Sequence, residues 1–209
     1  IWIGTRMGLF RFNPNNKKFT SYFTNQKDTN SINDNRISSI LPVNENIVYA
    51  GTKKGIAQIN VKDGTIKRFV HEENNPNSLI SNSVNQIIQD NKGRIWVLSD
   101  LGLQEFIPAK CCFRCFAPLK EKRLLQAAID KNGFLWILSQ NDMYIYNPEQ
   151  NKLLSSSYIA EIKKRNISSI SRDNTGCIYL GVENGVFSVD PKKLSDSIAV
   201  PPVILQSFV

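Results

Sequence analysis

The sequence predicts an all-β protein of the β-propeller class, built from four-stranded antiparallel blades. One phrase recurs five times along the chain: a short apolar run with an aromatic residue inside it, then small residues and a tight turn. The aromatic positions are spaced by 47, 47, 40 and 43 residues, and they are Trp2, Tyr49, Trp96, Trp136 and Tyr179. A period of about 40–50 residues made of short strands is typical of propellers, with one blade for each repeat.

The repeat around Trp96 shows the strands of one blade. Alternating apolar residues predict four strands, over 83–89, 94–99, 103–107 and 112–116. Asp90 and Gly93 occupy the first and last positions of a type I turn between the first two strands. Gly102 can supply a positive φ in the next tight connection.

Equivalent residues recur in the other repeats. The turn aspartate returns as Asp130 and Asp173, which indicates a structural role for all three aspartates. A single blade cannot bury both of its faces, so neighbouring blades must stack on each other. We therefore expect the repeated tryptophans and tyrosines to fill the space between blades, in preference to stacking on a ligand.

The repeats add up to about four and a half blades. The first repeat lacks its first strand, and the last has only one candidate for a fourth strand, within 203–208. Because propellers close to hide their sheet edges, we expect the C-terminal part of a larger propeller whose natural N-terminus lies upstream. The expected units are a partial blade over 1–24 and blades over about 35–71, 82–118, 122–157 and 165–200.

Composition indicates an ordinary globular chain. Apolar residues make up 41% of the 209 residues, which excludes general disorder. The net charge of +8 favours an acidic partner or simply a solvated basic surface, and the basic residues are scattered. No apolar run approaches the roughly 18 residues of a membrane span.

The cysteines do not form a strong metal motif. Cys112 and Cys115 have a C-x-x-C spacing, next to Cys111, but no second such pair exists and the one histidine is His71. The alternatives are a metal or redox site and free or partly paired thiols on an edge strand, of which the second is favoured. We predict no metal site and no cofactor.

The repeated residues resemble the two-component regulator propeller repeat. The shared features are Ile-Trp-Ile-Gly-Thr-x-x-Gly-Leu at 1–9, Asn-Pro after the third strand, and Asn-Pro-Asn-Ser-Leu at 75–79 followed by the turn at 90–93. The resemblance covers the chain from Ile1 to about Pro191. The third repeat has Leu98-Ser99 in place of Gly-Thr, and the fourth lacks Gly-Thr and Gly-Leu.

This resemblance implies a non-catalytic sensor in the periplasm, as part of an inner-membrane-anchored hybrid two-component receptor with a histidine kinase. It implies an oligosaccharide as the ligand and a homodimeric receptor. It also implies that 201–209 is an exit strand toward a following β-sandwich, and we expect seven blades in the whole propeller. The remaining blades and the sandwich would be partners of this portion, and nucleic acid would not.

A ligand site is expected where the loops before each first strand meet the second-to-third hairpins. Three of the four loops contribute a cation, and the hairpins add more, with no acid at the loop positions. Bidentate contacts from arginine would suit an acidic oligosaccharide; the alternative is a set of ordinary exposed loop residues. The candidate residues are Asn35, Arg36, Lys53, Lys54, Asn82, Lys122, Arg123 and Arg165.

Two other functions compete with a sensor. A propeller enzyme of the polysaccharide lyase or glycosidase type would need paired carboxylates or a histidine-centred acid–base set. His71 stands alone in the sequence, and the repeated aspartates lie in turns. A protein-interaction scaffold of the WD type would carry Trp-Asp endings, which the sequence lacks.

Overall fold

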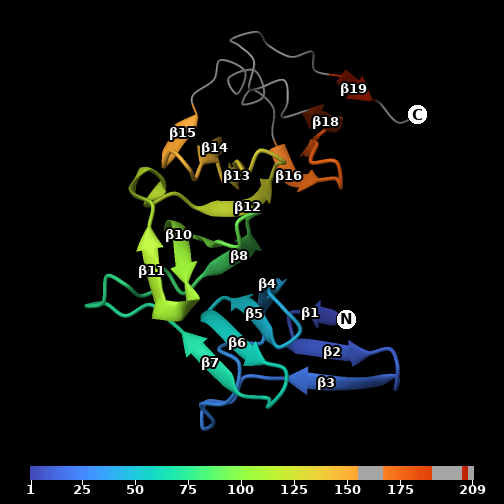
Figure 1. Ribbon diagram of the computed structural model, residues 1–209, viewed down its shortest axis with the longest axis vertical. Coiled ribbons are helices and arrows are strands. Elements are labelled where there is room, and N and C mark those ends of the chain that lie inside the picture. Colours follow the sequence, from blue (N-terminus) through green and yellow to red (C-terminus); the bar gives the residue numbers. More distant parts are fainter. Residues whose placement is uncertain (155–166, 190–203, 207–209) are drawn as a thin grey trace. The chain divides into compact units, whose positions relative to one another are not determined.

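The computed structural model describes residues 1–154, 167–189 and 204–206. The described part contains five antiparallel sheets, and each consists of strands that follow one another in the chain (Figure 1). The chain divides into two compact units, Ile1–Arg123 and Leu124–Val209, which we describe separately. This series of small antiparallel sheets is a partial β-propeller, which confirms the predicted fold class.

The first unit holds three sheets. The first sheet has three strands, β1 (Trp2–Gly4), β2 (Leu9–Asn13) and β3 (Lys18–Tyr22). The second has four, β4 (Ile37–Pro42), β5 (Ile47–Thr52), β6 (Gly55–Asn60) and β7 (Ile66–Phe69). The third has β8 (Val84–Gln89), β9 (Ile95–Ser99), β10 (Gly102–Ile107) and β11 (Cys112–Cys115), with 3₁₀ turns η1 (Pro108–Lys110) and η2 (Ala117–Leu119).

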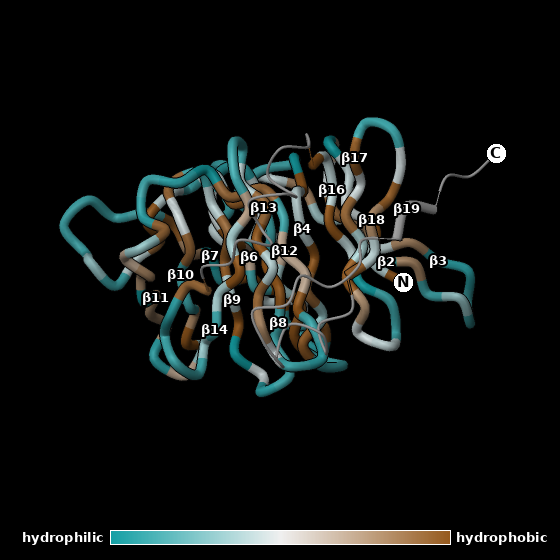
Figure 2. The backbone as a smooth tube through the Cα atoms, turned by 90° about the horizontal axis from the view of Figure 1, so that it is seen from above, coloured by the Kyte–Doolittle hydropathy of each residue, from teal (hydrophilic) through white to brown (hydrophobic). Residues whose placement is uncertain are grey.

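The second unit holds two sheets. The fourth sheet consists of β12 (Leu124–Ile129), β13 (Leu135–Ser139), β14 (Met143–Asn147) and β15 (Lys152–Leu154). The fifth consists of β16 (Ile167–Arg172), β17 (Ile178–Val182), β18 (Gly185–Val189) and β19 (Ile204–Gln206). In both units the strands carry most of the apolar residues and the connections are hydrophilic (Figure 2).

All four strands of the third sheet lie within one residue of the predicted ranges. The first sheet has no strand before β1, as the sequence indicated. In the fifth sheet β19 pairs with β18 as the fourth strand, within the candidate range 203–208. The role of 201–209 as an exit toward a β-sandwich stays a prediction. The described part therefore contains four complete sheets and one three-stranded sheet.

Every complete sheet has the same irregularity between its first two strands. The register shifts by one residue there, which is a β-bulge. The residue that the ladder skips is Ser38 in β4, Asn85 in β8, Leu125 in β12 and Ser168 in β16. A bulge changes the direction of side chains locally. The side chain at this position therefore does not follow the alternation between the two faces of the sheet.

The repeated aromatic residues pack as expected. Tyr49, Trp96 and Trp136 are buried, with 3%, 4% and 0% of their surface exposed. Tyr49 lies in an apolar cluster shared by the second and third sheets, and its ring meets Phe106 edge-on at 5.4 Å. Trp136 lies in a cluster shared by the fourth and fifth sheets. Tyr49 and Trp136 thus hold neighbouring sheets together within their units.

The repeated turn aspartates are structural. The Oδ1 atom of Asp130 accepts hydrogen bonds from the backbone amides of Asn132 and Phe134, at 2.8 and 3.0 Å. Asp90 and Asp173 make the same pair of bonds in their own turns. The carboxylate thus closes the turn before each second strand.

Candidate functional site

The hairpins between second and third strands are shaped by a hydroxyl group. The Oγ1 atom of Thr52 donates to the Gly55 carbonyl at 2.8 Å and accepts from the Lys54 amide at 3.0 Å. Ser99 makes the same two contacts, with Gly102 and Leu101. Serine therefore replaces the threonine of the repeat without losing the turn. This turn fixes the position of the residue that follows the hydroxyl, which is Lys53 in one hairpin and Asp100 in the other.

Four side chains from successive hairpins and loops form a connected polar group, which we name the Asp100 cluster. Lys53 Nζ donates to Asn85 Oδ1 at 2.6 Å and to Ser83 Oγ at 3.2 Å. Asn85 Nδ2 donates to Asp100 Oδ1 at 2.8 Å. Arg123 Nε donates to the same oxygen at 3.2 Å. The cluster comprises Lys53, Asn85, Asp100 and Arg123.

The bulge in β8 explains the central place of Asn85. Asn85 is the residue skipped by the ladder between Val84 and Gln86. Its side chain uses both ends of the amide, with the oxygen toward Lys53 and the nitrogen toward Asp100. The bulge thus connects the hairpin of the second sheet to that of the third.

The electrostatics of the cluster favour an ionised carboxylate. Burial alone raises the pKa of Asp100, but hydrogen bonds from Asn85 and Ser83 and the charges of Lys53 and Arg123 outweigh it. The net effect is a pKa below the ordinary aspartate value. Arg123 remains half exposed, with 53% of its side-chain surface accessible.

Arg36 is committed to a different carboxylate. Its Nε and Nη2 atoms lie 2.9 Å from Asp34 Oδ1 and Oδ2, which is a bidentate ion pair. The hydrogen bond from Arg36 is the largest cause that lowers the pKa of Asp34, and the charge of Lys54 adds to it. Arg36 is not among the bonded members of the Asp100 cluster.

The two predicted asparagines are structural. Asn35 Oδ1 accepts from the Thr24 amide at 2.8 Å, and Asn82 Oδ1 accepts from the His71 amide at 2.7 Å. Each therefore ties the end of a polar link to its start. Lys54 and Lys122 are exposed.

The structure brings Lys53 and Arg123 together, while Arg165 lies outside the described residues. Two carboxylates beside the predicted loop positions, Asp34 and Asp100, pair with Arg36 and Arg123 of the candidate set. Asp100 follows Lys53 by 47 residues, and Lys53 follows Arg6 by the same step. The repeat period could have identified Asp100 as the third member of this series, whereas nothing in the sequence marks Asn85 as a bulge residue.

The described residues contain no group of three or more His, Cys, Asp or Glu side chains placed to hold a metal ion. All four cysteines are free thiols, and Cys111 and Cys115 are exposed. Along the described ranges no helix has the length and apolar character needed to cross a membrane.

The chain carries a recognisable repeat in its third sheet. Residues 78–100 match the family model of the two component regulator propeller. This match confirms the resemblance over one repeat, and its range contains both Asn85 and Asp100. None of the curated proteins compared with the chain matches it.

Several solved structures have a similar fold. The extracellular domain of BT3049 of B. thetaiotaomicron, described as a hybrid two component system, has a TM-score of 0.75 and 18% identity over 92% of this chain and 27% of that one. The extracellular domain of BT4673 of the same organism, described as a one component system, has a TM-score of 0.71 and 23% identity over 90% and 25%. Virginiamycin B lyase of Staphylococcus aureus has a TM-score of 0.67 and 14% identity over 91% and 63%.

At these sequence identities, the structural similarity shows a shared fold and nothing more. The chain spans about a quarter of the length of the two B. thetaiotaomicron domains. The chain accordingly matches only part of each of those structures.

Proposed function

We propose that this chain is part of the extracellular sensor region of a two component system and that it binds without catalysing a reaction. The observation that carries the proposal is the match of residues 78–100 to the two component regulator propeller, together with the extracellular domains of similar fold. In the whole receptor, a membrane anchor and a histidine kinase would follow the propeller and a β-sandwich. Ligand binding would shift the balance between two states of a homodimer in the periplasm.

The Asp100 cluster is the proposed place of contact with an oligosaccharide. Its members alternate between cation, amide and carboxylate, which supply both donors and acceptors for sugar hydroxyl groups. Arg123 is the most accessible described partner of Asp100. Its guanidinium group can donate two parallel hydrogen bonds to the carboxylate of an acidic sugar. Lys53 belongs to a hairpin of the second sheet, and Asn85 and Asp100 belong to a strand and a hairpin of the third sheet. A sugar bound at the cluster would therefore bridge these two sheets of the first unit.

The chemistry of the described site supports binding in place of catalysis. Glycoside hydrolysis generally requires two carboxylates. The Asp100 cluster contains one, which accepts from Asn85 and Arg123 directly and connects to Lys53 through Asn85. The sole histidine of the chain, His71, holds the Leu79 carbonyl through Nδ1 at 2.6 Å. The likeness to virginiamycin B lyase is a likeness of fold, at 14% identity.

A panel of neutral and acidic oligosaccharides tests the proposal, with binding measured by calorimetry on the wild-type chain. For any oligosaccharide that binds, we expect Arg123→Ala to weaken affinity about 10-fold or more, as loss of a charge-assisted hydrogen bond does. Arg114→Ala is the matched control, because Arg114 is 71% exposed, carries the same charge and pairs with Glu105 within the third sheet.

Equal effects of the two substitutions would overturn the assignment of the Asp100 cluster. Chromatography would detect cleavage of a bound sugar by the wild-type chain. Such cleavage would overturn the non-catalytic role. Absence of binding to every oligosaccharide of the panel would overturn the proposed ligand class for this portion.

A further inference from the structure

Two polar links of the first unit have the same local structure. We name residues 24–35 link A and residues 71–82 link B; they lead into the second and third sheets, 47 residues apart. In link A, Ser31 Oγ accepts from the Asn25 amide at 2.8 Å and donates to the Asp28 carbonyl at 2.9 Å. In link B, Ser78 Oγ makes the same contacts with Glu72 and Asn75, at 3.0 and 2.8 Å.

The carbonyl groups of link A converge on one guanidinium group. Arg68 Nε donates to the Ser31 carbonyl at 2.6 Å. Its Nη2 donates to the carbonyls of Asp28 and Asn25, at 2.8 and 3.2 Å, and also to Ser31 Oγ. Link A is therefore a built receptor for a guanidinium group, and the chain supplies that group itself from β7.

Link B lacks the arginine. Arg68 faces Ala57 in the β6–β7 ladder, and Cys115 faces Gln104 at the same register of the β10–β11 ladder. Cys115 therefore stands where link A has Arg68. Gln104 Nε2 donates to the Ser78 carbonyl at 3.1 Å, and so replaces one of the four contacts of the guanidinium.

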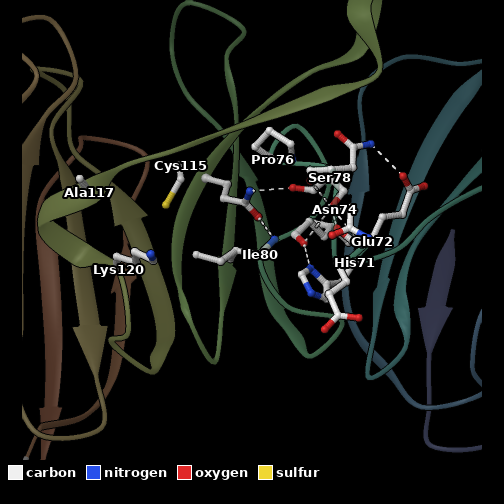
Figure 3. Close-up of a pocket in the computed structure, with 13 residues that line it drawn as sticks. His71, Glu72, Asn74, Pro76, Ser78, Ile80, Cys115, Ala117 and Lys120 are labelled. Atoms are coloured by element: carbon white, nitrogen blue, oxygen red, sulfur yellow. Dashed lines mark hydrogen bonds between the residues drawn. The ribbon is translucent and has the colours of Figure 1, made fainter.

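A cavity of about 450 Å³ occupies this place. Figure 3 shows the loop residues from His71 to Ile80 on one side and Cys115, Ala117 and Lys120 on the other. Gln104 also lines the cavity. The short thiol side chain of Cys115 leaves the space that the long arginine side chain fills beside link A.

The charges around the cavity suit a cation on the side of link B. Glu72 and Glu73 both line it. His71 Nδ1 lies 2.6 Å from the Leu79 carbonyl and therefore donates to it, so a neutral His71 keeps Nε2 as an acceptor. Lys120 is the cation on the opposite rim. Burial raises the pKa of the Cys115 thiol, and the charge of Lys120 opposes part of that rise.

We propose that this cavity binds a guanidinium group from outside the chain, in the place that Arg68 occupies beside link A. The ligand would be a small molecule or a peptide that presents an arginine-like side chain. The carbonyl groups of link B and the carboxylates of Glu72 and Glu73 would accept its N–H groups. The site is separate from the Asp100 cluster and does not depend on the proposed sensor function.

Methylguanidinium is the first probe, and methylurea is its neutral counterpart of nearly the same shape. We expect methylguanidinium to shift the backbone amide signals of residues 72–80 in a nitrogen–proton correlation spectrum, with at least 10-fold tighter binding than methylurea. Equal shifts with both compounds, or shifts spread over the whole chain, would overturn the proposal.

Cys115→Arg tests the site from within the chain. The new arginine would fill the cavity as Arg68 fills its counterpart, so we expect the methylguanidinium shifts at residues 72–80 to disappear. Cys111→Arg is the matched control, because it adds the same charge at an exposed cysteine outside the cavity. Undiminished binding in Cys115→Arg would overturn the proposal.

A second measurement needs no substitution. Alkylation of the wild-type chain at about pH 8.5, where thiols become reactive, is followed for each cysteine by mass spectrometry. We expect methylguanidinium to slow the alkylation of Cys115 at least threefold and to leave Cys111 unchanged, because only Cys115 lines the cavity. Equal rates for Cys115 with and without the probe would overturn the proposal.

Discussion

Trp136 Nε1 donates a hydrogen bond to Asp130 Oδ2 at 2.9 Å, and both residues have 0% of their surface exposed. The same carboxylate closes the turn before β13 through its other oxygen. One buried contact thus joins the repeated aromatic residue to the turn that precedes its strand. Trp96 with Asp90, at 3.1 Å, and Tyr179 with Asp173, also at 3.1 Å, repeat the contact with the same spacing of six residues.

We expect Trp136→Phe to lower the free energy of unfolding by about 2–4 kcal/mol. The substitution leaves a void in the core and removes one donor from a buried carboxylate. Denaturation in urea measures the change. Tyr179→Phe is the control, since it removes only a hydroxyl from a half-buried position, and we expect a clearly smaller loss. A loss for Trp136→Phe no larger than that control would contradict the role of the contact.

Asp90 should make stability depend on pH. Burial alone raises the pKa of Asp90, but hydrogen bonds from Trp96 and Arg94 outweigh it and hold the pKa below its ordinary value. A carboxyl whose folded pKa is lowered stabilises the fold above its unfolded pKa, near 4, and loses this contribution as pH falls through the folded pKa. The difference in melting temperature between wild type and Asp90→Asn should therefore be constant from about pH 7 to 5 and narrow below about pH 4. A constant difference down to pH 3 would be inconsistent with this pKa.

Gly102 should tolerate substitution poorly. Its φ is +137°, and a Cβ there would lie 2.7 Å from the Leu119 carbonyl oxygen. Gly93 also has a positive φ, +82°, but its nearest neighbour would be Gln89 Nε2 at 3.8 Å. We expect Gly93→Ala to cost about 1–2 kcal/mol from backbone strain alone, and Gly102→Ala to cost more because of the added collision. Equal melting temperatures for the two variants would refute the difference.

Ser99→Ala should loosen the hairpin that carries Asp100. Ser99 is buried, and its hydroxyl both donates to Gly102 and accepts from Leu101. We expect a loss of about 1 kcal/mol in the free energy of unfolding. Ser99→Thr should retain stability, because Thr52 fills the same role in the second sheet. Hydrogen exchange at Leu101 provides a local readout, and unchanged protection in Ser99→Ala would contradict the assignment.

The sequence was sufficient for the sheets and the turns, because each depends on local and repeated residues. The period of the aromatic residues and the Asp-to-Gly turns predicted β8 to β11 closely. The last strand, β19, lies within the range 203–208 that the sequence offered as a fourth strand, and its pairing with β18 joins segments separated by 14 residues from Val189 to Ile204.

The candidate site was predicted only in part. Lys53 and Arg123 belong to one hydrogen-bonded group through Asn85 and Asp100, two residues that the sequence reasoning missed. Side-chain pairing across sheets depends on the register of two strands, and a one-residue bulge changes which side chain faces a hairpin. The pairing of Arg36 with Asp34, two residues away, was also missed. The sequence did not distinguish an arginine paired with this neighbouring carboxylate from one that faces solvent.

The bulge shared by the four complete sheets has a consequence for the side chains that stand on it. The skipped residues Ser38, Asn85, Leu125 and Ser168 have no residue directly opposite them in the ladder. Two of these side chains reach the neighbouring sheet: Ser38 Oγ donates to the Val84 carbonyl at 2.6 Å, and Asn85 Oδ1 accepts from Lys53 at 2.6 Å. In the second and third sheets, an interruption of the ladder thus converts a strand position into a contact between sheets.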